Sequence, residues 1–144
     1  MGAMRGRLRV LLVEDNGARE SDLRAWLPDD IHLVWAKSAG QAIGVLKRDR
    51  GRVYAGILLD HDLQMQRRIG NDRTLTGQDV VRAIIDAVDT CVPILVHSMN
   101  RGGAPRMVAP LEGAGFVVTR RPWHAMTREI LEGWLEEVRE ATED

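Results

Sequence analysis

The segment Ile57-Leu58-Leu59-Asp60-His61-Asp62-Leu63 decides how the rest of the chain is interpreted. Its first three residues are apolar, which is typical of a buried strand in a parallel sheet. The run then ends on two carboxylates that flank an imidazole. Hard divalent cations prefer oxygen ligands, and imidazole binds metals or transfers protons. The segment therefore predicts a buried strand that places two carboxylates and an imidazole at the edge of a sheet. These groups indicate metal-assisted phosphate chemistry.

Apolar runs elsewhere in the chain alternate with segments of helical periodicity. The predicted strands are residues 8–13, 31–35, 53–59, 93–97 and 116–119. The predicted helices contain the apolar positions of residues 23–27, 39–46, 80–88, 107–111 and 130–138. Strands that alternate with helices indicate an α/β fold, in which helices cover both faces of a doubly wound, five-stranded parallel sheet.

Length, composition and charge bound the possible functions. A chain of 144 residues is the size of one domain, so we expect a single domain over 1–144 with a core of about 7–139. The net charge of −1 gives no field that would favour DNA or membrane surfaces. No apolar run reaches the length of a membrane span, no signal peptide is apparent, and one cysteine excludes an internal disulfide. We therefore expect a cytoplasmic protein.

Polar groups follow four of the predicted strands. In a doubly wound sheet, ligands bind outside the carboxyl ends of the strands. These ends carry Glu14-Asp15, Asp60-His61-Asp62, His97-Ser98-Met99-Asn100 and Arg120-Arg121-Pro122.

The four groups, in this order, resemble the active site of a receiver domain, the phosphoacceptor module of two-component response regulators. The resemblance covers essentially the whole chain and implies a flavodoxin-like sheet of strand order 2-1-3-4-5. It implies that Glu14 and Asp15 hold a divalent cation and that Asp60 is the phosphoacceptor. Ser98 matches the hydroxyl that contacts the phosphoryl group. Arg121 stands where receivers have a lysine, and arginine makes a bidentate phosphate contact instead of a point-charge contact.

Two motifs resemble a specific branch, the cyclic-phosphate processing receivers. Its L-D-H-D-L run is matched by residues 59–63, and its H-S-x-N-x-x-G run is matched by residues 97–103. The segment between Asp62 and Gly77 is longer than in an ordinary receiver and is rich in arginine. His61 and His97 are a further departure, because an ordinary receiver needs neither histidine. The resemblance implies that the domain opens or hydrolyses cyclic phosphates.

From the resemblance and the residue chemistry we predict a site with three kinds of residue. The predicted ligands of Mg²⁺ or Mn²⁺ are Glu14, Asp15, Asp60 and Asp62. The predicted catalytic residues are Asp60, His61, His97 and Ser98. The predicted phosphate-binding residues are Ser98, Asn100 and Arg121. Strand alternation argues against part of this set, because His97 should point away from a pocket that Ser98 faces.

Three functions remain open from the sequence. The first is a metal-dependent phosphoesterase that acts on a cyclic phosphate, such as that of a nucleotide. The second is a signalling receiver that a histidine kinase phosphorylates on Asp60 and that acts through an effector protein. The third is a pseudo-receiver that binds a partner or nucleotide without chemistry.

Trp123 and His124 either stack on a base or pack under the last helix. No DNA or membrane partner is expected.

Overall fold

Five parallel strands form one sheet in the order β2-β1-β3-β6-β7, which confirms the predicted order 2-1-3-4-5. The computed structural model describes residues 7–62, 66–67, 74–98 and 105–143. The strands of the sheet are β1 (Leu8–Val13), β2 (Ile31–Ala36), β3 (Gly56–Asp60), β6 (Ile94–Ser98) and β7 (Val118–Pro122). Because β1 lies between β2 and β3, the order of the strands reverses at β1, and a ligand crevice is expected beside its carboxyl end.

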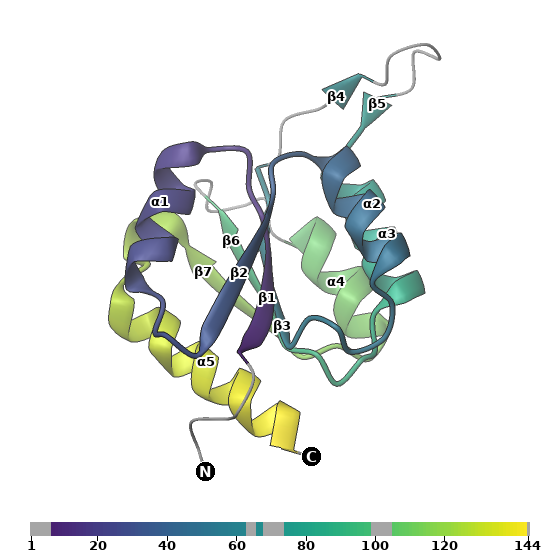
Figure 1. The fold of residues 1–144 in the computed structure, drawn as a ribbon. Coiled ribbons are helices and arrows are strands. Elements are labelled where there is room, and N and C mark those ends of the chain that lie inside the picture. Colours follow the sequence, from purple (N-terminus) through teal and green to yellow (C-terminus); the bar gives the residue numbers. More distant parts are fainter. Residues whose placement is uncertain (1–6, 63–65, 68–73, 99–104, 144) are drawn as a thin grey trace.

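Five helices cover the sheet, as the alternating pattern predicted. They are α1 (Gly17–Trp26), α2 (Ala39–Arg48), α3 (Gly77–Ala87), α4 (Pro105–Gly113) and α5 (Arg128–Glu143). Helices α1 and α5 lie on one face, and α2, α3 and α4 lie on the other (Figure 1). No helix in the described part of the chain is long and apolar enough to cross a membrane.

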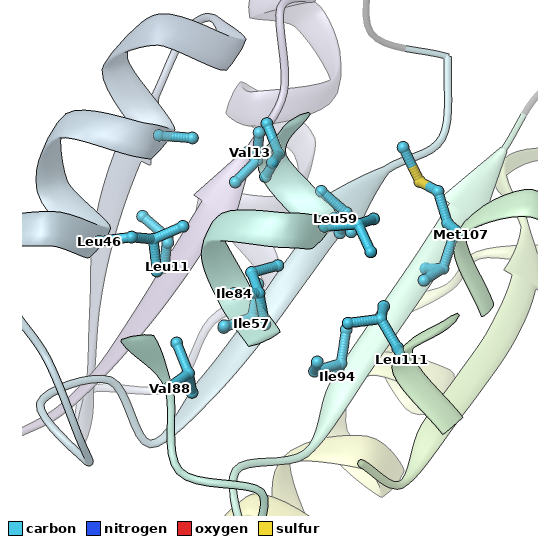
Figure 2. Packing of buried hydrophobic residues seen from close by; sticks show 14 of the residues in the cluster. Leu11, Val13, Leu46, Ile57, Leu59, Ile84, Val88, Ile94, Met107 and Leu111 are labelled. Carbon is cyan, nitrogen blue, oxygen red and sulfur yellow. The ribbon is translucent and has the colours of Figure 1, made fainter. Parts of the chain in front are cut away.

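The central strands are apolar on both faces, and alternate residues pack into two separate cores. Leu11, Ile57 and Ile94 belong to the core under α2, α3 and α4, part of which Figure 2 shows. Leu58 and Leu95 belong to the core under α1 and α5. Burying both faces explains why these strands read as continuous apolar runs in the sequence.

Two strands begin two or three residues later than the sequence predicted, and several other strand boundaries move by one to three residues. The third strand of the sheet begins at Gly56 and not at residue 53, because Tyr54 is fixed in the preceding turn by its hydroxyl, which donates to Asp49 Oδ2 at 2.6 Å. The fifth begins at Val118 and not at residue 116, because the Phe116 N–H closes the end of α4 on the Leu111 carbonyl. Buried apolar residues in turns therefore extended both predicted strands.

The polar segment after β3 contains a short antiparallel pair that the sequence pattern did not predict. Its strands are β4 (Gln66–Arg67) and β5 (Thr74–Leu75). Most of the arginine-rich stretch that the sequence singled out lies outside the described residues. A 3₁₀ turn, η2 (Trp123–Ala125), which was also not predicted, connects β7 to α5.

A capping box fixes the start of α3 directly after this segment. The Thr76 side chain accepts the Gln78 N–H at 3.2 Å, and Asp79 Oδ2 accepts the Thr76 N–H at 2.9 Å. We expect Thr76→Ala to lower the free energy of unfolding by about 1 kcal/mol, because helix N–H groups lose their acceptor. Urea denaturation would measure the change. Thr76→Ser keeps the hydroxyl and should stay close to wild type, so equal losses in both variants would contradict the assignment.

Candidate functional site

Three neighbouring strands each bring one side chain that can bind a metal to the same edge of the sheet. Glu14 follows β1, Asp60 ends β3, and His97 is the register partner of Asp60 in β6. All three residues are fully buried. One ligand atom of each lies within 4.8 Å of the other two. The sequence motifs therefore converge on a compact cluster of two carboxyl groups and one imidazole.

The cluster lies on the face of the sheet that α1 and α5 cover. Each member follows, by two residues, a leucine of the core under these helices: Leu12, Leu58 and Leu95. Strand side chains alternate faces with a period of two, so all three groups point to this face.

His97 points to the opposite face from Ser98, as strand alternation predicts, but this does not separate it from the acidic groups. Its Nε2 lies 2.9 Å from Glu14 Oε1, and both side chains are completely buried. The sequence argument left open whether His97 faces the site, because it held only if Ser98 points to the pocket. In the structure the acidic groups Glu14 and Asp60 share the face of His97.

The chain turns after β3 and brings Asp62 back over the strand ends. The Asp62 N–H donates to Asp60 Oδ1 at 2.8 Å, and Ser98 Oγ donates to Asp62 Oδ2 at 3.2 Å. His61 Nδ1 lies 3.2 Å from Asp62 Oδ1. Asp62 therefore connects the serine and the second histidine to the buried cluster, although these residues leave the sheet on different faces.

Burial sets the charge states of the cluster. The pKa of Asp60 is raised to about 7, mainly by loss of solvation and to a smaller extent by the hydrogen bond with Glu14. Burial also raises the pKa of Glu14 and lowers the pKa of His97 to about 4. His97 is therefore an uncharged imidazole at neutral pH, which is the form that binds metals or accepts a proton.

Arg19, which the sequence analysis did not single out, lies within ion-pair distance of the cluster. Its Nε lies 3.6 Å from Glu14 Oε1, and its Nη1 lies 4.0 Å from Asp60 Oδ1. It occupies the third residue of α1, after the cap at Asn16. A basic side chain at a helix N-terminus opposes the helix dipole. This unfavourable position in the first turn of a helix is the feature of the sequence that could have marked Arg19 as a site residue.

The side chain of Trp123 packs against the cluster and is partly buried. Its ring stacks on Trp26 with centroids 6.2 Å apart and lies 5.5 Å from the His97 ring. The guanidinium carbon of Arg19 lies 5.9 Å from the Trp123 ring centroid. Of the two predicted alternatives, the structure therefore shows packing for Trp123, whereas His124 is exposed.

The remaining predicted residues lie further out or outside the described residues. Asp15 is exposed, next to the buried Glu14. Arg121 is exposed and donates from Nη1 to the Arg120 carbonyl at 3.4 Å. Asn100 lies outside the described residues. The metal-binding role of Asp15 and the phosphate-binding roles of Arg121 and Asn100 stay predictions.

Comparison with known families decides the assignment. The family described as the cyclic-phosphate processing receiver domain matches residues 10–113, well over half of the chain. The chain belongs to the cyclic-phosphate processing receiver family. The matched range of this receiver includes all three buried cluster residues and Arg19, but it ends before β7 and Arg121.

Solved structures similar to this receiver share its fold. A receiver domain of a sensor histidine kinase from Pseudomonas aeruginosa, described with magnesium in its active-site cleft, is 24% identical with a TM-score of 0.65; the match covers 92% of this chain and 96% of that one. A signal receiver domain of an HD-domain-containing protein from Pseudomonas fluorescens is 15% identical with a TM-score of 0.69, over 96% and 99%. The response regulator domain of Thermotoga maritima CheB is 18% identical with a TM-score of 0.62, over 96% and 98%. No curated protein matches the chain.

The buried cluster of this receiver fits a divalent cation. Asp60 Oδ2 and His97 Nδ1 are buried and have no hydrogen-bond partner among the described residues. An unpartnered buried carboxylate oxygen is costly, and a cation would satisfy it. Carboxylates suit Mg²⁺ and Mn²⁺, and imidazole suits transition metals better than Mg²⁺. The donor set therefore fits a divalent metal with Glu14 and Asp60 as its first ligands.

A cavity of about 330 Å³ lies at the opposite, amino-terminal edge of the sheet. It is lined by the start of β1, by the residues that precede β3 and β6, and by the end of α5. No residue of the acidic cluster lines it. The candidate site is therefore the cluster at the carboxyl edge, where the buried titratable groups converge, and not this cavity.

Proposed function

We propose that this receiver binds a divalent cation in its acidic cluster and opens or hydrolyses a cyclic phosphate of a nucleotide or a related ligand. The observation that carries the proposal is the buried pair of His97 and Glu14, 2.9 Å apart beside Asp60. An imidazole inside the carboxylate cluster is not needed to store a phosphoryl group. It is useful where protons must move during phosphate chemistry.

The reaction adds water to phosphorus and breaks one ester bond of the ring. The products are a phosphomonoester and a free hydroxyl, so one proton must leave the water and one must reach the alkoxide. The cation, held by Glu14 and Asp60 with Asp15 and Asp62 as further candidates, would stabilise charge on the phosphoryl oxygens. Ser98, Asn100 and Arg121 are the proposed contacts of the phosphate itself.

The two histidines differ in ways that suggest separate roles. His97 is fully buried and uncharged at neutral pH, so it suits metal binding or proton acceptance beside Glu14. His61 has 18% of its side chain exposed and lies against Asp62. Contact with solvent lets His61 regain a proton after each turnover. We therefore assign donation of the proton to the leaving alkoxide to His61.

Removing His61 tests this assignment. We expect His61→Gln to lower kcat by about 10²-fold or more, because positioned acids and bases contribute about 10²–10⁴-fold. The assay would follow hydrolysis of cyclic mononucleotides, cyclic oligonucleotides and 2′,3′-cyclic ends with Mg²⁺ or Mn²⁺. The exposed His124→Gln is the matched control and should retain activity. Absence of turnover by the wild type on all three substrate classes would refute the proposed function.

A second candidate function is phosphorylation of Asp60 by a histidine kinase, with a partner protein as effector. Asp60 Oδ2, which is buried at the end of β3 and has no hydrogen-bond partner within the described residues, favours it. Beryllofluoride with Mg²⁺ mimics an aspartyl phosphate. We expect it to change tryptophan fluorescence if Asp60 is a phosphoacceptor, because Trp123 packs on the neighbouring His97. A spectrum that does not change would argue against this function.

A further inference from the structure

We propose that Arg19 of α1 is a phosphate-binding residue of this site and donates its guanidinium N–H groups to the phosphoryl oxygens of the ligand. The sequence resemblance assigned that contact to Arg121 of β7. The inference deepens the proposed function, and it rests on that function only in requiring that a phosphate group binds beside Asp60.

The position of Arg19 supports the inference. Arg19 bridges the two buried carboxyl groups from the helix side, 3.6 Å from Glu14 Oε1 and 4.0 Å from Asp60 Oδ1. A phosphate bound at the end of β3 would lie beside Asp60. The guanidinium would therefore reach it without any rearrangement of the fold.

The hydrogen bonding of Arg19 supports it further. Nη1 is buried, yet among the described residues it has no hydrogen-bond acceptor. Both ion-pair distances exceed the length of a charge-assisted hydrogen bond, which is about 2.7–2.9 Å. A buried donor without an acceptor is costly, and phosphoryl oxygens provide acceptors of the right charge. Guanidinium is also the side-chain group that matches phosphate in a bidentate manner.

The charges around Arg19 explain how it can have a role both in the metal-free protein and in the protein with a bound cation. Without a cation, its positive charge offsets the two carboxyl groups, whose repulsion would otherwise be uncompensated. Once a divalent cation neutralises these carboxylates, the guanidinium is free to pair with an anionic ligand. The Trp123 ring, 5.9 Å from the guanidinium carbon, holds the group over the cluster in either state.

Arg121 is arranged differently. It is exposed, and its Nη1 donates to the adjacent Arg120 carbonyl at 3.4 Å. Binding phosphate would require Arg121 to leave this contact and to move from solvent towards the cluster. Arg19 is already there.

Titration with inorganic phosphate in the presence of Mg²⁺, measured by calorimetry, tests the inference. We expect Arg19→Gln to weaken the Kd at least about tenfold, and Arg19→Lys to restore part of the loss because it keeps the charge without the fork. Arg24→Gln is the matched control, because Arg24 lies on the same helix and pairs with Glu20 at 2.6 Å. It should bind phosphate as the wild type does.

A second readout separates binding from folding. Phosphate should change the emission of Trp123 by pairing with the guanidinium group that lies beside its ring, and the change should be lost in Arg19→Gln and in Trp123→Phe. Circular dichroism would confirm that the variants are folded, with Arg19→Lys as the variant that keeps the buried charge. Either of two results overturns the inference: an Arg19→Gln variant that binds within about twofold of wild type, or a wild type that binds no phosphate. Absence of turnover with intact phosphate binding would instead refute the proposed function alone.

Discussion

Asp60→Asn is expected to abolish turnover and, in the metal-free protein, to raise stability. The turnover loss, about 10³-fold or more, follows from removing the carboxylate that we propose as a ligand of the cation and a neighbour of the reacting phosphate. The gain in stability follows from the environment of Asp60. Its side chain is fully buried beside Glu14, and Oδ2 has no partner among the described residues. An amide of the same shape carries no charge to desolvate.

The sign of the pH dependence follows from the raised pKa. Asp60 titrates near 7 in the folded protein and at its ordinary value of 3.8 when unfolded. Between these values the folded state holds more protons, so stability falls as pH rises from about 4 to about 7. The penalty is absent at lower pH and complete above 7. Asp60→Asn should therefore gain about 4 kcal/mol at pH 8 and little at pH 4, because each of the roughly three pKa units between 3.8 and 7 corresponds to about 1.4 kcal/mol.

Urea denaturation at pH 4 and pH 8, without and with Mg²⁺, measures both effects. Mg²⁺ should stabilise the wild type by mass action and should stabilise Asp60→Asn less, because one ligand has lost its charge. The exposed Asp22→Asn is the matched control and should show no such pH-dependent gain. A gain of the same size at pH 4 and pH 8, or a loss at pH 8, would contradict the account of Asp60.

Gly56→Val is expected to lower the free energy of unfolding by about 3 kcal/mol. Gly56 starts β3 in the middle of the sheet, and α5 packs directly on it. A Cβ at this position would lie 2.8 Å from Trp134 Cη2 and 2.9 Å from Val138 Cγ2. Both side chains are buried, so neither can move without displacing the helix. Overpacking of this kind costs about 1–3 kcal/mol, and valine adds two methyl groups beyond the first clash.

Chemical denaturation with tryptophan fluorescence measures this effect, because Trp134 reports on the contact itself. Gly44→Ala in α2 is the control, since a Cβ there would meet nothing within 4 Å. It should raise stability by about 0.5–1 kcal/mol through the higher helix propensity of alanine. A Gly56→Val variant as stable as wild type would mean that α5 does not press on β3 as the structure indicates.

The sequence predicted the strand order through its family resemblance and the elements through their periodicity, but it misplaced some boundaries. Residues 53–55 and 116–117 read as strand because they are partly apolar. The structure places Tyr54 and Phe116 in turns, held by a side-chain bond to Asp49 and a backbone bond to Leu111. The pairing of β4 with β5 was missed for a related reason. Such bonds join residues whose proximity depends on the fold and not on local pattern.

The candidate site shows the same division. Glu14, Asp60 and His97 were found as strand ends, since parallel strands place their carboxyl ends at one edge. Alternation correctly predicted that His97 and Ser98 leave the strand on opposite faces. It could not show that the carboxylates share the face of His97, or that the turn after β3 brings Asp62 to Ser98. Arg19 was missed because its role depends on how α1 sits over the strand ends.

By itself, the sequence determined the α/β class, the alternation of elements and the residue types that end the strands. These features follow from the hydrophobic periodicity and the local chemistry of the chain, both of which depend only on residues that are close in sequence. Only the tertiary structure decided which polar groups touch, which are buried and which cation compensates them. The contacts of His97 with Glu14 and of Arg19 with Asp60 span different elements. Desolvation, which sets the charge of Asp60 and His97, arises only when helices close over the sheet.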